Sequence, residues 1–285
     1  MPLNRACLGK TYSAIGEVTC EAIQNYARAC NEDNPRYFDP VAASSIVAPP
    51  LFAVVVTWIP LISALTDQDL RADLMRLLHT AQAIEFLAPI RPGDRISATA
   101  RIAEIGAVTG GESLTLELDA ANQHGAQVNR TRFTVLIRGR RDTAAATEAR
   151  AAASAALPPD PPRWSVVQAI DRDQTFRYAE ASGDRNPIHV DENVAKMAGL
   201  PGIIVHGLCT MAFAARAAID TLCGGDPLRL KLLAVRFSRP IVPGDSLTTS
   251  IWPAGGDSSH RIYSFASTNG QGLTVMRDGR AEVAP

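Results

Sequence analysis

The sequence predicts an α+β protein built from two tandem copies of one unit, each a long helix followed by an antiparallel sheet. Three observations predict this class. The stretch "RRDTAAATEARAAASAALPPDPPRW", residues 140–164, is rich in Ala and then in Pro, and it lies at the midpoint of the chain, as a linker would. The same motifs recur in the same order on each side of it. Within each side, an apolar run precedes segments in which apolar and polar residues alternate.

The recurring motifs can be paired residue by residue. Tyr26 corresponds to Tyr178, Asn34-Pro35 to Asn186-Pro187, Asp39 to Asp191, and "IEFLAPIRPGDRI" (84–96) to "VRFSRPIVPGDSL" (235–247). The shared P-G-D step predicts a turn between two strands, because Pro presets φ and Gly accepts an unusual backbone angle. We therefore place a first unit at 1–142, a linker at 143–163 and a second unit at 164–285.

The periodicities place the elements of each unit in order. In the second unit a short segment at 165–169 and a helix over 173–181 precede a loop of Gly, Asn and Pro. The run "LCTMAFAARAAIDTL", residues 208–222, predicts a buried central helix of about four turns. Strands follow at 232–241, 246–255, 261–269 and 273–283, and the first unit has its strands at 84–90, 95–105, 113–122 and 128–138. Two such sheets in tandem would pair into one continuous surface.

Composition excludes several classes of partner. The formal charge of −1, without a block of like charges, argues against a nucleic-acid surface. No apolar run reaches the roughly 18 residues of a membrane helix, and the first residues lack the apolar core of a signal peptide. Five cysteines, an odd number without metal-type spacing, indicate free thiols in a reducing compartment, the cytosol.

The loop "SGDRNPIH" carries the candidate catalytic residues. Asp184 and His189 lie five residues apart, with Pro187 stiffening the loop between them. A carboxylate facing an imidazole near neutral pH can hold a water and exchange protons with it, and the Asn186 amide can bond the same water. The alternative is an ordinary turn in which Asp and Asn bond the local backbone.

His206-Gly207, just before the apolar helix, is a candidate oxyanion site. A Gly N–H at a helix N-terminus directs a donor and the positive end of the dipole at whatever lies in front of it. The alternative is a plain helix cap. In the first unit the corresponding positions hold Pro49 and Pro50, and that of His189 holds Tyr37. Because Pro has no N–H, the first copy lacks donor and base together, as a non-catalytic copy would.

Residues 178–217 resemble the signature of the R-specific enoyl-CoA hydratases (hydratase 2), within the MaoC-like dehydratases, through "SGDRNPIH" and "IIVHGLCTMAFAARA". The resemblance covers essentially the whole chain and implies a double hot-dog fold in which only the second unit is catalytic. It implies that Asp184 and His189 activate the water, that Asn186 supports them and that Gly207 holds the thioester oxygen. The implied substrate-binding residues are His79, Thr80, Pro187, His206 and Phe237. A family lysine near CoA falls on Val108 here.

The implied reaction is the reversible syn addition of water to a trans-2-enoyl thioester, giving the R-3-hydroxyacyl product, by a hydro-lyase. No metal or redox cofactor is expected, and CoA enters as part of the substrate. Alternatives are the same chemistry on an acyl-carrier-protein thioester or on branched, dicarboxylic or steroid acyl groups, a thioesterase, and a non-catalytic acyl-binding module. A thioesterase is disfavoured because residues 208–219 contain no carboxylate. A homodimer is possible, whereas no nucleic acid or membrane partner is expected.

Overall fold

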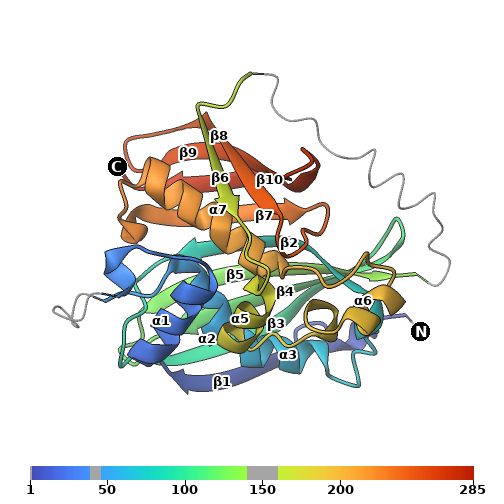
Figure 1. Ribbon diagram of the computed structural model, residues 1–285. Helices are drawn as coiled ribbons and strands as arrows, with labels where there is room; N and C mark the ends of the chain where they lie inside the picture. Colours follow the sequence, from blue (N-terminus) through green and yellow to red (C-terminus); the bar gives the residue numbers. More distant parts are fainter. Residues whose placement is uncertain (1, 39–45, 140–159) are drawn as a thin grey trace.

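The computed structural model describes residues 2–38, 46–139 and 160–285, which form one antiparallel sheet of ten strands (Figure 1). The strand order is β1-β3-β4-β5-β2-β7-β10-β9-β8-β6. The strands are β1 (Thr11–Glu17), β2 (Leu77–Phe86), β3 (Arg95–Val108), β4 (Gly111–Ala121), β5 (Gln127–Arg138), β6 (Trp164–Ala169), β7 (Leu230–Phe237), β8 (Ser246–Gly256), β9 (Arg261–Asn269) and β10 (Thr274–Val283).

The two halves of the sheet repeat one strand order. Reading outward from the middle, β2, β5, β4, β3 and β1 correspond to β7, β10, β9, β8 and β6. The halves join where β2 pairs with β7, and Ala83 faces Ala234 at the centre of that ladder. The predicted single continuous sheet is therefore confirmed, and the ladder relates the halves by an approximate twofold axis.

The helices lie mainly on one side of this sheet in Figure 1. They are α1 (Cys20–Ala29), α2 (Ala53–Val56), α3 (Trp58–Leu65), α5 (Gln174–Ser182), α6 (Glu192–Met197) and α7 (Gly207–Leu222), with short 3-10 turns η1 (Arg5–Cys7), η2 (Pro35–Tyr37), η4 (Pro50–Phe52), η5 (Leu74–Arg76), η6 (Pro187–His189) and η7 (Pro227–Arg229). The predicted helix over 208–222 is confirmed as α7, which is buried along most of its length.

The first half has no equivalent long helix among its described residues. The stretch from Pro50 to Leu65 is divided into η4, α2 and α3, and Thr57 ends α2 and precedes α3. Pro60 lacks the N–H that a continuous helix would use to bond four residues back, so the chain breaks near this point. The predicted repeat of a long central helix is therefore wrong for this half.

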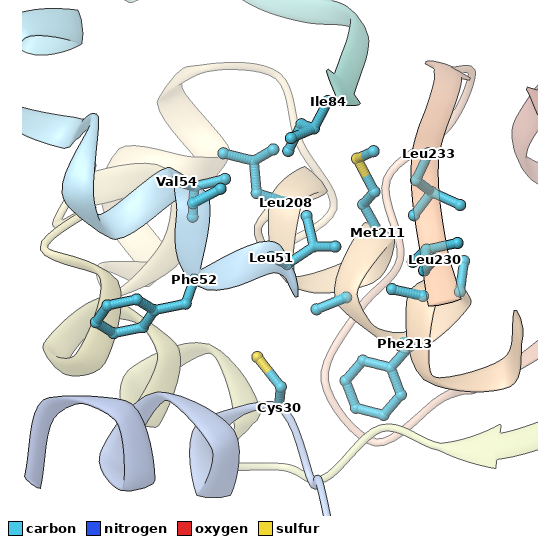
Figure 2. Close-up of a cluster of buried hydrophobic side chains, with 14 of the residues drawn as sticks. Cys30, Leu51, Phe52, Val54, Ile84, Leu208, Met211, Phe213, Leu230 and Leu233 are labelled. Carbon is cyan, nitrogen blue, oxygen red and sulfur yellow. The ribbon is translucent and has the colours of Figure 1, made fainter. Parts of the chain in front are cut away.

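One apolar core joins the halves. Figure 2 shows Leu51 and Val54 of the first half beside Leu208 and Met211 of α7, and Phe52 belongs to the same buried cluster. The corresponding tyrosines Tyr26 and Tyr178 are both fully buried, and their ring centroids lie 5.7 Å apart. A second cluster lies between α3 and the outer strands of the first half, with Leu61, Leu70, Leu116 and Phe133 among its members.

Some boundaries differ from the sequence-based ones. The strand predicted over 84–90 instead begins at Leu77 and ends at Phe86, since Pro89 cannot donate to a ladder. Strand β1 and its pairing with β3 were not predicted. Most of the predicted linker, 143–159, lies outside the described residues. All five cysteines are free, and no helix among the described residues has the length and apolar character needed to cross a membrane.

Candidate active site

The candidate catalytic loop begins where α5 ends. Gly183 has φ +81°, and its N–H donates to the Ala179 carbonyl, a left-handed helix end that favours Gly. Trp58 of α3 covers this turn: a Cβ added to Gly183 would lie 3.1 Å from Trp58 Cδ1. The first half therefore fixes the position from which the second half's loop departs.

Asp184, Asn186 and Pro187 shape the loop through local hydrogen bonds. Asp184 Oδ1 accepts from the Asn186 N–H at 3.2 Å, and Asn186 Oδ1 accepts from the Ile188 N–H at 3.4 Å. Pro187 is exposed and begins η6. The turn interpretation thus holds for Asn186 Oδ1, but the Nδ2 donors of this side chain remain for a ligand.

His189 is held as one tautomer. Its ring lies 7% exposed, and Nδ1 is 2.8 Å from the Ile204 carbonyl oxygen. Because a carbonyl oxygen can only accept, Nδ1 carries the proton and donates it to that bond. In the neutral ring, Nε2 therefore presents a lone pair, which is what a general base requires.

His206 contacts both Asp184 and His189. It is 1% exposed and stacks on His189, with ring centroids 3.8 Å apart and planes inclined by 25°. Its Nε2–H donates to the Asp184 backbone carbonyl at 2.9 Å, and its Nδ1 accepts from Thr175 Oγ1 at 3.2 Å. Both ring nitrogens of His206 are thus engaged, in bonds that hold it against Asp184 and His189, and its role in substrate binding stays a prediction.

Thr175 is a supporting residue that sequence reasoning did not identify. It is fully buried in α5, and its hydroxyl also lies 3.0 Å from the His189 carbonyl oxygen. One Thr inside a predicted helix gives no signal of such a role, because the partners come from residues 14 and 31 positions away.

Burial shifts the titration of these groups. Burial raises the pKa of Asp184, against the opposing effect of His189, and burial lowers the pKa of His189, against the charge of Asp184. Burial and the neighbouring His189 also lower the pKa of His206 to about 2, so His206 stays neutral. Both shifts favour the neutral forms, and a neutral acid beside a neutral base can donate one proton and accept another.

Gly207 is the first residue of α7, and the preceding His206 makes no side-chain capping bond. The first N–H groups of an α-helix have no partner within the helix, so the N-terminus of this 16-residue helix can meet a negative oxygen. A Cβ at Gly207 would lie 3.3 Å from Phe237 Cε1, so Gly207 and the Phe237 ring are neighbours.

The first half contributes His79 and Thr80 to the same region. The His79 ring lies between Phe237 and Phe133, with centroids 4.7 and 4.2 Å away, and its Nε2 lies 3.1 Å from the Ala81 carbonyl oxygen. Burial lowers the pKa of His79 to about 4, against hydrogen bonds that favour its protonated form. Thr80 Oγ1 donates to the Thr134 carbonyl. Phe237 thus links residues from both halves.

A metal is not well accommodated by these side chains. Asp184, His189 and His206 each offer one ligand atom within 4.8 Å of the others. Both nitrogens of His206 and Nδ1 of His189 already form hydrogen bonds. Only the Asp184 carboxylate and His189 Nε2 remain, fewer than the three protein ligands usual for catalytic zinc.

Comparison with known proteins identifies the family. The "MaoC like domain" model matches residues 153–272, and the "FAS1-like, dehydratase domain region" model matches residues 10–131. The chain is 32% identical over 211 residues to 3-hydroxyacyl-thioester dehydratase Y of Mycobacterium tuberculosis, covering 72% of each chain. The chain belongs to the MaoC-like dehydratases. It is also 30% identical to enoyl-CoA hydratase 2, peroxisomal, of Arabidopsis thaliana, over 72% of this chain and 69% of the relative.

Solved structures of this family share the fold. A MaoC-like dehydratase from Phytophthora capsici superposes with a TM-score of 0.81 at 23% identity, covering 100% of this chain and 98% of the other. The full-length peroxisomal multifunctional enzyme type 2 of Drosophila melanogaster has a TM-score of 0.79 at 21% identity, covering 96% of this chain and 48% of the other. A Mycobacterium tuberculosis protein described as a double hot-dog fold superposes with a TM-score of 0.64 at 12% identity, covering 99% of this chain and 98% of the other, which confirms the double hot-dog fold predicted from the resemblance.

Proposed function

We propose that this MaoC-like dehydratase catalyses the reversible syn hydration of trans-2-enoyl thioesters to R-3-hydroxyacyl thioesters. The observation that carries the proposal is the single tautomer of His189, which directs Nε2 toward the site beside the Asp184 carboxyl group. The names of two relatives, a 3-hydroxyacyl-thioester dehydratase and an enoyl-CoA hydratase 2, support the same reaction.

In the proposed reaction, Asp184 and His189 hold one water. Nε2 of His189 accepts a proton from the water as its oxygen bonds to C3 of the enoyl group, and the pair returns a proton to C2 on the same face. One water is consumed, and the pair ends with the number of protons with which it began. Asn186 Nδ2 donates to the water.

The thioester carbonyl gains negative charge as C3 is attacked. We assign its stabilisation to the Gly207 N–H at the start of α7, aided by the helix dipole. Phe237, His79 and Thr80 lie where the acyl thioester passes between the halves. CoA is the expected thioester carrier, and the protein itself needs no further cofactor for this chemistry.

The test follows the loss of enoyl thioester absorbance with crotonyl-CoA and a medium-chain enoyl-CoA. Asp184→Asn and His189→Ala should each lower kcat/KM by about 10²–10⁴-fold, the usual range for a lost general acid or base. His124→Ala, an exposed histidine in a distant turn, is the matched control and should keep full activity. Coupling to an S-specific 3-hydroxyacyl-CoA dehydrogenase should yield no NADH.

Activity that survives both substitutions would refute the assignment of the pair. Formation of NADH at the hydration rate would refute R specificity. A wild-type protein inert toward both CoA thioesters but active on the same acyl groups carried by acyl carrier protein would keep the reaction and change the carrier.

A further inference from the structure

A cavity of about 190 Å³ lies between the two halves, away from the candidate active site. Pro49 and Pro50 at the start of η4, Phe86 at the end of β2, and Leu230 and Lys231 at the start of β7 line it. Most of its surface is apolar. None of the residues proposed for hydration contributes to it.

This cavity is the counterpart of the candidate active site across the approximate twofold axis. In the β2–β7 ladder, Ala81 faces Arg236 and Leu232 faces Glu85, so each pairing recurs with the strands exchanged. Continuing this register by one residue at each end places Thr80 opposite Phe237 at the active site.

The same step at the other end places Lys231 opposite Phe86 at the cavity. Pro49 and Pro50 likewise occupy the positions of His206 and Gly207, and Leu230 that of His79. The cavity therefore keeps the location of a ligand site. Its Pro residues remove the oxyanion donor, since Pro has no N–H.

One lining residue, Asn129, is buried without hydrogen bonds to its side chain among the described residues. Asn129 is 1% exposed, and among the described residues neither its Nδ2 nor its Oδ1 has a hydrogen-bond partner. It lies on the inward face of β5, opposite Phe86, and lines the cavity. Leaving a buried donor and acceptor unpaired is costly, so a group bound in the cavity that bonds this amide would relieve a penalty already present in the fold.

Lys231 adds a positive charge at the same place. Within the part of the chain that the structure describes, no carboxylate pairs with its ammonium group. A polar head that accepts hydrogen bonds and carries negative charge therefore fits the two polar residues, and an aliphatic body fits the rest of the lining.

We propose that this cavity is a second, non-catalytic ligand site for a short aliphatic monocarboxylate. Its carboxylate accepts from Asn129 Nδ2 and Lys231 Nζ, and a bridging water serves Asn129 Oδ1. A cavity of about 150 Å³ holds benzene, so this volume suits a ligand of about six to eight non-hydrogen atoms, such as hexanoate. The site does not depend on the proposed hydration reaction.

The test is isothermal titration calorimetry of the full chain with sodium hexanoate at pH 7. Binding should saturate with a Kd on the order of 1 mM, from the efficiency of small ligands. Asn129→Leu and Lys231→Gln should each weaken binding about tenfold or more, as expected for a lost hydrogen bond to a charged group. Thr131→Val is the matched control: Thr131 is also inward-facing on β5 and 3% exposed, and its hydroxyl has no partner in the part of the chain that the structure describes, but it does not line the cavity.

Two further measurements separate this site from the active site. The melting temperature of Asn129→Leu should not fall below that of the wild type, because the substitution removes unpaired polar atoms without leaving a void. Its kcat/KM for crotonyl-CoA should stay within about twofold of the wild-type value. Hexanoate affinity should be unchanged in Asp184→Asn. The proposal is overturned by absence of saturable binding up to 20-fold above the expected Kd, by equal affinities in wild type, Asn129→Leu and Lys231→Gln, or by equal weakening in Thr131→Val.

Discussion

The support of the catalytic pair by Thr175 leads to a sharp prediction. Thr175 Oγ1 lies 3.0 Å from the His189 carbonyl oxygen and 3.2 Å from Nδ1 of His206, and it is fully buried. Thr175→Val removes the hydroxyl and keeps the branched shape of the side chain. Nδ1 of His206 then has no donor, and water cannot replace the hydroxyl without opening the packed interior.

The magnitude follows from the exposure and the contacts. An unpaired buried acceptor costs about 1–3 kcal/mol of unfolding free energy. His206 donates to the Asp184 carbonyl and stacks on His189, so its displacement moves both proposed catalytic groups. Since a shift of about 1 Å can cost roughly 10²-fold in rate, we expect kcat to fall about 10- to 100-fold. KM should change little, because the Thr175 hydroxyl bonds none of Phe237, His79 and Thr80, the residues proposed to lie along the acyl thioester.

Thr249→Val is the matched control. Thr249 is fully buried as well, and its hydroxyl lies 2.9 Å from Ser267 Oγ in the sheet between β8 and β9. Urea unfolding should show a loss of similar size in both variants, while steady-state hydration of crotonyl-CoA should fall only in Thr175→Val. Thr175→Ser, which keeps the hydroxyl, should restore most of kcat. Loss of stability in Thr175→Val with wild-type kcat would refute the positioning role.

Three other predictions concern titration and backbone strain. His206 has a pKa of about 2 in the fold and about 6.5 when unfolded, so the unfolding free energy should fall by about 1.4 kcal/mol for each pH unit below 6.5. In urea titrations from pH 6.5 to 4.5, His206→Asn should lack this contribution to the slope of unfolding free energy against pH, and an unchanged slope would contradict the prediction. Burial raises the pKa of Glu32 to about 8, so its contribution to stability is full below pH 4.5 and is lost as pH rises through 8. Glu32→Gln should therefore melt higher than wild type at pH 8.5, and an equal or lower melting temperature would argue against the raised pKa of Glu32. Gly183→Ala should lower the unfolding free energy by about 1–2 kcal/mol through the positive φ of Gly183, and by more through the contact with Trp58. Gly125→Ala, with φ +77° and open space around the new Cβ, should show the backbone cost alone. Equal losses in urea unfolding would mean that Trp58 moves aside without cost.

Elements with strong periodicity were predictable from the sequence. The apolar run at 208–222 corresponds to α7, and the predicted strands at 95–105, 113–122 and 128–138 correspond to β3, β4 and β5. These segments bury one face or all faces of a regular element, so local pattern and tertiary packing favour the same structure. The prediction of a long helix in the first half was wrong because it followed the apolar composition of the segment. Pro60 interrupts the hydrogen bonds that a continuous helix would need.

The sequence was sufficient to identify the residues of the site, but not the hydrogen bonds that define their roles. The motif SGDRNPIH identified Asp184 and His189 as candidates, and the structure places their side chains together with that of His206. The tautomer of His189 depends on the Ile204 carbonyl, and the support of His206 depends on Thr175. These partners are fixed only by the tertiary path of the chain, which no local pattern reports.

Having both units in one chain has an evolutionary consequence at the Ala83–Ala234 axis. In a symmetric dimer of identical subunits, any substitution near the axis occurs twice and alters both sites equally. Here each position mutates alone, so Thr80 and Lys231, or Gly207 and Pro50, are free to diverge. Having both units in one chain thus removes the requirement that corresponding positions hold the same residue, and selection can act on each position separately.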